Sequence, residues 1–488
     1  MLIRLHIKGF KSLKDVEIHF GPFTCIAGVN GSGKSNLFDA IQFLRDLTEY
    51  PIIEAATRVR DPLGRTGDIR ALFTQGQGYI EEMQFEADFI VSQSVKDDFN
   101  REARPTSTFL NYKLDLRYVS ACENSPERIE LVKEELSYIT KENATNKLGF
   151  PVKHTFLNSI ITNKRKGQGF ISTDEQISSD YENSNVIRLH QDGGSSGRPV
   201  QIPAVGSPKT VLGGINTNDY PTVLAARREM QSWSLLQLEP SALRQPDAYS
   251  AESRVLSNGA HMPATLWRLG AQTRVSNRLA TLLDDVRSVQ VERDESRRSY
   301  TLVVTRLDST QHAARSLSDG TLRFLALAII AEDIESGRLI CLEEPENGIH
   351  PSRIQAILEL LKDMTVDINE KVDDDNPLRQ VIINTHSPVV LSSLNTEDLI
   401  MARLTHSAGS TATIFEYVED TWRGQIDNNR PSVAPGMVKA YLQVDGDEKE
   451  NQKKEHNLPL LQSTKKTKTT REYVNQLSSD NQLHLDFG

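Results

Sequence analysis

Alternating hydrophobic and polar positions open the chain and predict two half-buried strands. The pattern runs through Leu2–Ile7 and again through Val16–Phe20, with the period of a strand that buries one face. The continuous apolar run Phe23–Ala27 lies between a proline and a glycine and is typical of a buried central strand. Residues 35–47 then show apolar positions at helical spacing. The opening of the chain therefore predicts three strands followed by a helix.

The pattern changes twice in the middle of the chain. From about residue 80 to 140 the chain alternates again, most clearly over residues 110–139, and predicts further strands. The Gly, Pro and Ser content of residues 188–222 instead predicts a loop or flexible insert. From residue 222 to 285 the apolar positions return to helical spacing, and we include Trp233–Leu236 in this helical region. No internal repeat or sustained heptad pattern is found, so long coiled-coil arms are not expected.

Apolar runs alternate with helical segments in the C-terminal half of the chain. Residues 287–307 predict a hairpin around a charged turn, and a helix is expected to begin near Gly320. Leu339–Leu342 and Val381–Ile383 predict buried strands, with a further helix over residues 354–361 between them. This alternation is typical of an α/β fold in which helices cover a mainly parallel sheet.

Composition is that of a soluble globular protein. The chain has 488 residues, of which 38% are hydrophobic and 25% charged, and a formal net charge of −10. The acidity argues against a uniformly basic nucleic-acid binder, although a local basic groove stays open. No run of 18 apolar residues predicts a membrane span, and the alternating start is not a signal peptide. With three cysteines, neither a disulfide scaffold nor a Cys-rich zinc site is expected, and we expect a cytoplasmic protein.

The length allows about three domains. The tail is polar, and its basic cluster Lys465–Arg471 and apolar end Leu483–Phe487 fit either a docking segment or a solvated tail. We expect an N-terminal part over residues 1–140, an insert and helical region over 141–285, a C-terminal lobe over 286–444 and a partly disordered tail over 445–488.

The segment from residue 28 to 35 carries the chemistry of a phosphate site. It reads G-V-N-G-S-G-K-S and fits G-x-x-x-x-G-K-[ST] in full. Glycines let backbone N–H groups wrap around phosphates, Lys34 adds positive charge, and the Ser35 hydroxyl ligates Mg²⁺. A predicted strand precedes the loop and a helix follows it, as the motif requires. We therefore expect ATP and Mg²⁺ as ligands, with phosphate contacts from Gly28, Asn30, Gly31, Ser32, Gly33, Lys34, Ser35 and Asn36.

Two adjacent carboxylates end the predicted strand over Leu339–Leu342. Beside a phosphate loop, Glu343 would hold Mg²⁺ and Glu344 would polarise the attacking water. His386 closes the next predicted strand, at the sheet edge where ligands bind. A contact with the γ-phosphate and an ordinary capping role both stay open for this histidine. Ser318, Asp319 and Gly320 open a helix, and a Ser-Asp pair in this place is also an ordinary N-cap.

The order of these motifs resembles the RecF, SMC and OLD-type ATPases. The resemblance covers residues 1–140 and 235–400. It rests on several segments: Ile7–Ser12 with the phosphate loop as the family opening, Leu317–Thr321 as the ABC signature, Leu342–Pro351 as Walker B and D-loop, and Thr385–Pro388 around the switch histidine. Arg244, Leu256–Gly259 and Pro263 before a helix also resemble this group. It implies an ABC/SMC-like P-loop ATPase head of two lobes, with mixed and parallel sheets, flanking helices and a helical or irregular insert.

The resemblance also implies a composite site. Ser318, Asp319 and Gly320 of one chain would contact ATP bound by another, so ATP would join heads into a dimer or higher homo-oligomer. Glu343 stands where the family usually has Asp, and Asp319 where many ABC proteins have Gly, so slow hydrolysis is expected. Gln75 and Gln77 are weak candidates for the Q-loop, and we prefer to interpret them as ordinary loop glutamines.

The sequence says least about which further activity the ATPase would control. Asp445 and Asp447 resemble an acidic metal pair but lack a buried strand, so no nuclease site of its own is expected. This pattern resembles the PtuA-type ATPase subunits of the Septu anti-phage system, which act with a separate HNH nuclease subunit. The resemblance implies a gated scaffold that contacts DNA through the complex and does not bind membranes. A RecF-like repair ATPase that binds duplex DNA itself, and an ATP sensor with little hydrolysis, stay open as alternatives.

Overall fold

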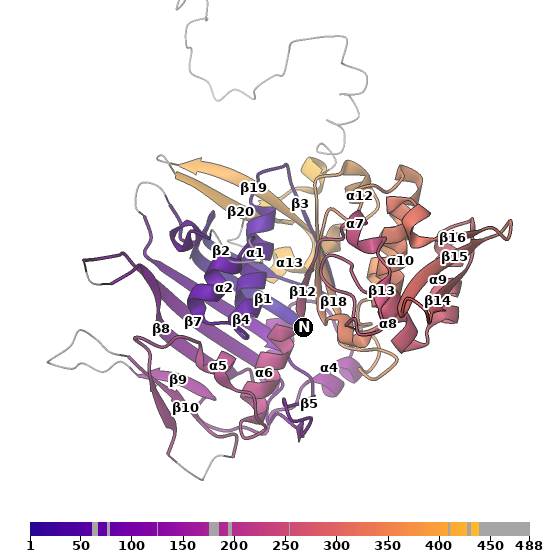
Figure 1. Ribbon diagram of the computed structural model, residues 1–488. Coiled ribbons are helices and arrows are strands. Elements are labelled where there is room, and N and C mark those ends of the chain that lie inside the picture. Colours follow the sequence, from indigo (N-terminus) through magenta and orange to yellow (C-terminus); the bar gives the residue numbers. More distant parts are fainter. Residues whose placement is uncertain are drawn as a thin grey trace, which may run out of the picture. The chain divides into compact units, whose positions relative to one another are not determined.

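The computed structural model describes most of the unit Met1–Leu442. The described ranges are residues 1–60, 67–75, 79–123, 125–174, 185–193, 198–252, 254–407, 410–426 and 431–438. The predictions for Gln77, for Asp445 and Asp447, and for the tail fall outside these residues. The described part contains two large sheets with helices packed on them (Figure 1). The expected α/β class with mixed and parallel sheets and flanking helices is confirmed.

The first large sheet is antiparallel and has eight strands. The alternation over residues 110–139 produces two long neighbouring strands, as predicted. Residues 188–222 are not a loop throughout. The prediction is wrong for Val200–Pro203, which is an edge strand, and for Val211–Gly214, which is a short helix. In sheet order the strands are β11 (Val200–Pro203), β10 (Val186–Leu189), β9 (Ile171–Asp174), β8 (Arg128–Tyr138), β7 (Phe109–Val119), β4 (Glu82–Ile90), β1 (Leu2–Phe10) and β2 (Leu13–His19).

The second large sheet is mainly parallel and has seven strands. An N-terminal strand lies at its centre, between two strands that come more than 350 residues later. Trp233–Leu236 is a strand at its edge, so the helical prediction for these four residues is wrong. The run is too short for its periodicity to distinguish helix from strand, and its pairing with the buried strand β17 determined its conformation. In sheet order the strands are β12 (Trp233–Leu236), β17 (Leu339–Glu343), β18 (Gln380–Thr385), β3 (Phe23–Ala27), β19 (Leu399–Ser407), β20 (Ser410–Val418) and β21 (Ser432–Val433).

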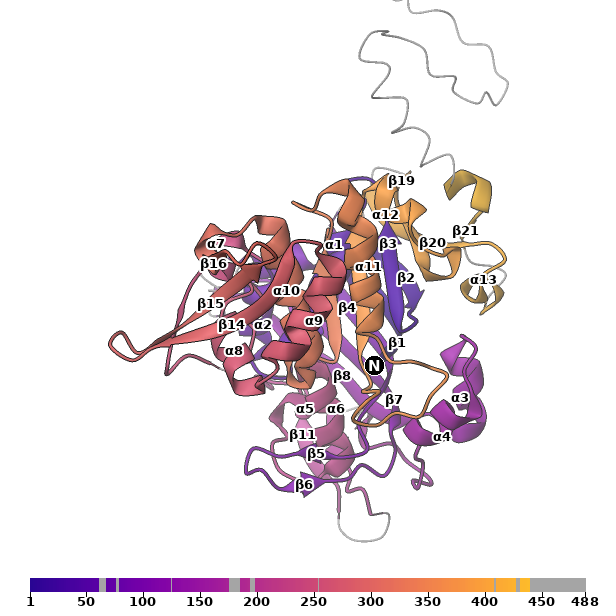
Figure 2. The ribbon, with the colours of Figure 1, turned by 90° about the vertical axis from the view of Figure 1, so that its right-hand side faces the viewer.

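Helices cover both faces of the parallel sheet. Ile26, Cys341 and Ile382 point to the core that contains α1 (Lys34–Asp46), while their neighbours Ile340 and Ile383 point to the opposite core. This burial on both faces explains the continuous apolar runs in the sequence. Figure 1 shows α1 and α2 (Ile52–Arg58) over the antiparallel sheet, and Figure 2 shows α9 (Gln272–Leu282), α10 (Asp319–Glu332) and α11 (Ile354–Asp363) together. The other helices are α3 (Lys141–Leu148), α4 (His154–Ile160), α5 (Val211–Gly214), α6 (Pro221–Gln231), α7 (Pro240–Leu243), α8 (Met262–Leu269), α12 (Pro388–Ser392) and α13 (Trp422–Ile426).

A small third sheet carries the predicted hairpin. It consists of β13 (Asp247–Ala248), β15 (Ser299–Arg306), β14 (Val286–Asp294) and β16 (Gln311–Ala313). A separate two-stranded sheet is formed by β5 (Val95–Lys96) and β6 (Glu102–Ala103). Trp267 of α8 stacks on Tyr300 of β15 with ring centroids 5.5 Å apart. The guanidinium of Arg293 lies 5.2 Å from the Trp267 ring centre. Stacking and cation–π attraction therefore hold the hairpin against α8.

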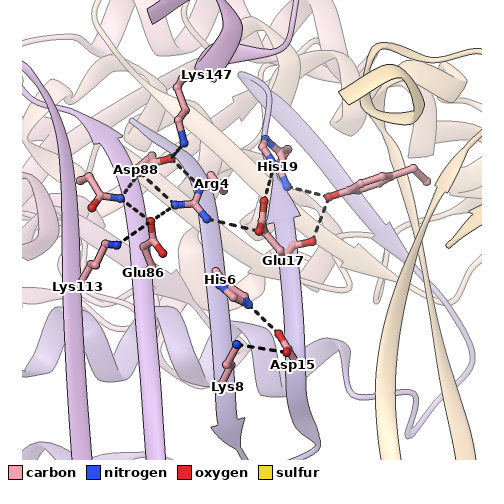
Figure 3. A network of polar contacts seen from close by, with 12 residues as sticks. Arg4, His6, Lys8, Asp15, Glu17, His19, Glu86, Asp88, Lys113 and Lys147 are labelled. Carbon is pink, nitrogen blue, oxygen red and sulfur yellow. Dashed lines mark hydrogen bonds and ion pairs between the residues drawn. The ribbon is translucent and has the colours of Figure 1, made fainter. Parts of the chain in front are cut away.

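A network of charged side chains joins neighbouring strands of the antiparallel sheet, among them β1, β2 and β4 (Figure 3). The Arg4 Nε donates to Asp88 at 2.7 Å, and the same guanidinium contacts Glu86 and lies 3.5 Å from Glu17. Lys147 of α3 lies 3.7 Å from Asp88. Burial opposes the charge on Arg4, but the bond to Asp88 and the neighbouring carboxylates outweigh it and raise the pKa of Arg4. The polar positions of these alternating strands thus pair across the sheet.

No helix among the described residues is long and apolar enough to cross a membrane.

Candidate functional site

The phosphate loop connects the central strand β3 to α1. Gly31 has a φ of 78° and Gly33 a φ of 91°, values that favour glycine. A Cβ on Gly33 would lie 1.9 Å from the Thr413 hydroxyl of β20, so no side chain fits there. The amide of Asn36 donates to the Ser12 hydroxyl at 2.7 Å, and Ser12 lies 2.6 Å from the Thr413 hydroxyl. Contacts from the β1–β2 turn and from β20 therefore hold the loop in shape.

The polar groups of this loop fit a phosphate ligand. The Lys34 ammonium donates to the backbone oxygens of Gly28 and Val29 at 2.7 and 2.9 Å. Burial lowers the pKa of Lys34, while the nearby carboxylates of Glu344 and Glu343 act in the opposite direction. The Ser32 hydroxyl is buried without a hydrogen-bond partner, so a phosphate oxygen would satisfy it. The residues present thus match the ATP and Mg²⁺ expected from the sequence.

The two carboxylates lie where β17 ends and the chain turns. Glu344 has a φ of 44°, a left-handed conformation that costs energy for a residue with a Cβ and that is concentrated at functional sites. Its N–H donates to the backbone oxygen of Asn384 at 3.0 Å. The Asn384 amide in turn donates to the Glu343 carboxylate at 3.3 Å. The end of β18 therefore positions both carboxylates.

The Glu344 carboxylate is held from two sides. The Nδ1 of His386 lies 2.8 Å from one carboxylate oxygen. The amide of Asn347 donates to the other oxygen at 2.7 Å. A carboxylate that is oriented by two partners is suited to accept a proton from a water molecule. His386 is thus next to the residue that we expected to polarise water.

One cleft of about 470 Å³ brings the phosphate loop and the carboxylates together. Residues 30–36 form one wall, and Glu343, Glu344 and Asn384 form another. Gly28 is not among the cleft residues, and its N–H donates to the Thr385 backbone oxygen at 3.2 Å. His386, another predicted site residue, is not among the cleft residues, but its ring contacts Glu344, which is one of them. Gln75, the described Q-loop candidate, is exposed and is not among the cleft residues.

The structure adds residues that sequence reasoning missed. Arg60 and Asn347 line the cleft, and Arg60 is held by Asp39 of α1 at 2.7 Å. Nothing in the sequence around Arg60 indicated this position, whereas Asn347 lies within the Walker B and D-loop segment. Glu346 is 9% exposed and accepts a hydrogen bond from the Thr385 hydroxyl. Burial raises the pKa of Glu346.

The signature segment lies outside the described lining of this cleft. Ser318 is the N-cap of α10, and its hydroxyl accepts from the Thr321 N–H at 3.3 Å. Asp319 forms an ion pair with Arg244, which balances the negative charge that the sequence introduces here. A Cβ on Gly320 would lie 3.0 Å from the Gly348 oxygen. The capping interpretation of Ser318 is therefore confirmed, and the ligand role stays a prediction.

Two family models match separate parts of the chain. The model described as "AAA domain, putative AbiEii toxin, Type IV TA system" matches residues 220–392. The model described as "RecF/RecN/SMC N terminal domain" matches residues 1–50. The first segment carries the signature and Walker B, and the second carries the phosphate loop. Together the two matches support an ATP-binding, ABC/SMC-like P-loop ATPase.

A curated relative matches over a short segment. The OLD nuclease of Thermus scotoductus is 43% identical over 44 residues, which are 9% of this chain and 8% of that protein. The match therefore spans less than a tenth of the relative's length.

Solved SMC head structures resemble the chain over most of its length. An SMC head bound to the C-winged helix domain of ScpA has 14% identity and a TM-score of 0.43, and covers 85% of this chain and 98% of that one. The SMC head domain from Thermotoga maritima has 14% identity and a TM-score of 0.35, with 84% and 97% covered. A Pyrococcus furiosus SMC head with an extended coiled coil, bound to the C-terminal domain of ScpA, has 12% identity and a TM-score of 0.42, with 85% and 96% covered.

Proposed function

We propose that the cleft between the phosphate loop and the Walker B carboxylates binds ATP with Mg²⁺ and hydrolyses it slowly. The observation that carries this proposal is the single cleft in which Lys34, Ser35, Glu343 and Glu344 meet. These residues come from two elements separated by about 300 positions in the sequence, and their chemistry is the set that phosphoryl transfer requires.

Each side chain has a role in this proposal. Lys34 and the backbone N–H groups of residues 30–36 bind the phosphates, aided by the N-terminus of α1. Ser35 and Glu343 hold Mg²⁺, which neutralises phosphate charge when it is bound. Glu344 accepts the proton of the attacking water, and His386 keeps its carboxylate oriented at 2.8 Å. Arg60, which also lines the cleft, adds positive charge near the phosphates.

We further propose that two heads assemble around ATP. Ser318 is exposed at the start of α10, and the signature lies outside the described lining of its own chain's cleft. A signature that serves the ATP of a second chain is consistent with both observations. The expected assembly is a homodimer or higher homo-oligomer that forms with ATP and separates after hydrolysis.

The resemblance to Septu ATPase subunits suggests the finer function. In that proposal the chain is a cytoplasmic scaffold in anti-phage defence that holds or gates a separate HNH nuclease and contacts DNA through the complex. A RecF-like repair ATPase is the second candidate, and the match to residues 1–50 favours it. An ATP sensor with little hydrolysis is the third.

The enzymatic part is tested with three variants and a phosphate-release assay. Lys34→Ala should abolish ATP binding, because its ammonium is the central cation of the loop. Glu344→Gln should bind ATP but release phosphate at least roughly a hundredfold more slowly, since it removes the proton acceptor. Ser318→Arg should bind ATP normally and fail to assemble in analytical ultracentrifugation. Normal hydrolysis by Glu344→Gln would contradict the assigned role.

The defence role is tested by plasmid cleavage with the purified chain, alone and with the product of its neighbouring gene, with and without ATP. Cleavage that needs the neighbour and changes with ATP supports the scaffold. Cleavage by the chain alone means that a nuclease site was missed. ATP-dependent duplex binding by the chain alone, weakened by salt, favours the repair function.

A further inference from the structure

The signature segment has a cation beside it, Arg244, which does not line the phosphate cleft of its own chain. Arg244 follows the short helix α7, which packs against α10 (Figure 1). Its guanidinium donates to the backbone oxygen of Leu317 at 3.2 Å and to the Asp319 carboxylate. These two residues are the immediate neighbours of Ser318, so the charge of Arg244 is held beside the exposed Ser318.

This guanidinium can bind a further anion. Its third hydrogen bond goes to the Pro240 backbone oxygen at 3.1 Å. The three bonds do not use all N–H groups of the guanidinium, and the remaining ones have no partner among the described residues. The ion pair with Asp319 is open to water, because the two side chains are 30% and 49% exposed. Exposed ion pairs are weak, so Asp319 does not prevent Arg244 from binding a phosphate.

The charge around the signature suits a phosphate. Residues 314–323 contain two arginines, Arg315 and Arg323, and one carboxylate, Asp319. Arg244 adds a third cation to this group. Glu346 also acts on Arg323, but burial raises the pKa of Glu346, which favours its neutral carboxyl. Together with the positive end of the α10 dipole, the signature therefore carries a net positive charge.

The phosphate cleft, in contrast, has as many carboxylates as cations in its described lining. Lys34 and Arg60 stand against Glu343 and Glu344, and their charges cancel. ATP with one Mg²⁺ carries a net charge of about −2, and part of it lies on the γ-phosphoryl oxygens during transfer. The cleft does not neutralise this charge by itself, so a cation from a facing chain would stabilise it.

We propose that Arg244 is a catalytic residue in trans: its guanidinium donates to a γ-phosphoryl oxygen of ATP that is bound in the cleft of a second chain. In the reaction the water oxygen bonds to the γ-phosphorus, Glu344 takes one water proton, the bond to the bridging oxygen breaks and ADP leaves. Arg244 supplies hydrogen bonds and charge only. Asp319 keeps the guanidinium beside Ser318 before the heads meet. The inference rests on the proposed ATPase function and on assembly through the signature.

Mixed oligomers test whether Arg244 acts across the interface. Lys34→Ala lacks the central phosphate-binding cation but presents an intact Arg244, whereas Arg244→Ala binds ATP without the guanidinium. Each variant alone should release phosphate at least roughly a hundredfold more slowly than the unmodified chain. Their equimolar mixture should recover about a quarter of the unmodified rate, because random dimers contain one complete site in every four. No recovery would place the action of Arg244 within one chain and overturn the inference.

A second set of variants separates phosphate contact from a structural role. If Arg244 served only to neutralise Asp319, the double variant Arg244→Ala/Asp319→Ala would restore phosphate release, whereas we expect it to stay as slow as Arg244→Ala. Arg244→Lys should recover part of the rate, because it keeps the charge but not the planar fork. Arg274→Ala is the matched control, since Arg274 also pairs with a carboxylate of α10, Glu332, but at the other end of the helix. It should hydrolyse ATP as the unmodified chain does.

Assembly provides a readout that does not depend on hydrolysis. In the Glu344→Gln background, adding Arg244→Ala should weaken ATP-dependent assembly roughly tenfold in analytical ultracentrifugation. ATP binding to the single chain, measured by calorimetry, should not change. Normal phosphate release by Arg244→Ala, its restoration in the double variant, or unchanged assembly would overturn the inference and leave the proposed ATPase standing. Absence of phosphate release by the unmodified chain would contradict the proposed function and this inference together.

Discussion

Replacing Gly33 with alanine tests whether packing, and not backbone freedom alone, requires glycine in the phosphate loop. The added Cβ would lie 1.9 Å from the Thr413 hydroxyl and 2.9 Å from the Ser12 hydroxyl. Gly31 offers a matched control, because its φ is also positive, at 78° against 91°, and a Cβ there would meet no atom within 4 Å. The two alanine variants therefore share the backbone penalty and differ in the clash.

The magnitude follows from these contacts. A positive φ costs alanine roughly 1–2 kcal/mol, and this term applies to both variants. The clash at Gly33 adds roughly 1–3 kcal/mol of overpacking. Moving Thr413 aside also breaks its 2.6 Å hydrogen bond with Ser12, for about 1 kcal/mol more. Gly33→Ala should therefore lower the free energy of unfolding by roughly 2–4 kcal/mol more than Gly31→Ala.

Urea unfolding followed by tryptophan fluorescence measures this difference. Adding Thr413→Ala to Gly33→Ala should recover roughly 1–2 kcal/mol, because it removes the closest atom and leaves Thr413 Cβ at 3.0 Å. ATP binding should be weaker in Gly33→Ala than in Gly31→Ala for the same reason. Equal destabilisation by both alanines, with no recovery in the double variant, would refute the contribution of packing.

Two further predictions concern stability away from the site. Burial raises the pKa of Glu134 from 4.5 to about 7 despite hydrogen bonds from the Val211 and Leu212 N–H groups. The contribution of the protonated Glu134 carboxyl to the free energy of unfolding is full below pH ~4.5 and is lost as the pH rises through ~7. The free energy of unfolding should therefore fall by about 1 kcal/mol between pH 6 and 8, and Glu134→Gln should remove this step. Trp267→Ala should cost roughly 1–3 kcal/mol in thermal unfolding by removing the stack on Tyr300, with Trp267→Phe restoring part of it; an unchanged midpoint would contradict the role of this stack.

The contiguous part of the candidate site could be predicted from the sequence. Residues 28–33 form a loop that continues into the first turn of α1, and the chemistry of this segment depends on near neighbours. The strand before it and the helix after it were predicted from apolar patterning. Glu343 and Glu344 were found because they end a buried run, and the ends of parallel strands meet at one edge. The partners of Glu344 were not predicted, because Asn347 and His386 reach it through turns whose direction local patterns do not specify.

The wrong predictions share a physical cause. Trp233–Leu236 is only four residues long, and its pairing with β17 decided its conformation. Val200–Pro203 became a strand because it pairs with β10 at the sheet edge. Arg60, which was missed, follows α2 and lines the cleft, where its guanidinium pairs with Asp39 of α1. In each case contacts with distant residues outweighed weak local preferences.

The sequence by itself determined the α/β class, the phosphate loop and the chemistry of the two carboxylates, since these depend on residue type and short-range periodicity. Only the tertiary structure decided that β3 lies between β18 and β19 and that Thr413 closes against Gly33. The reason is that these contacts join segments hundreds of residues apart, and their energies appear only after the chain has closed those loops and packed both faces of the central sheet.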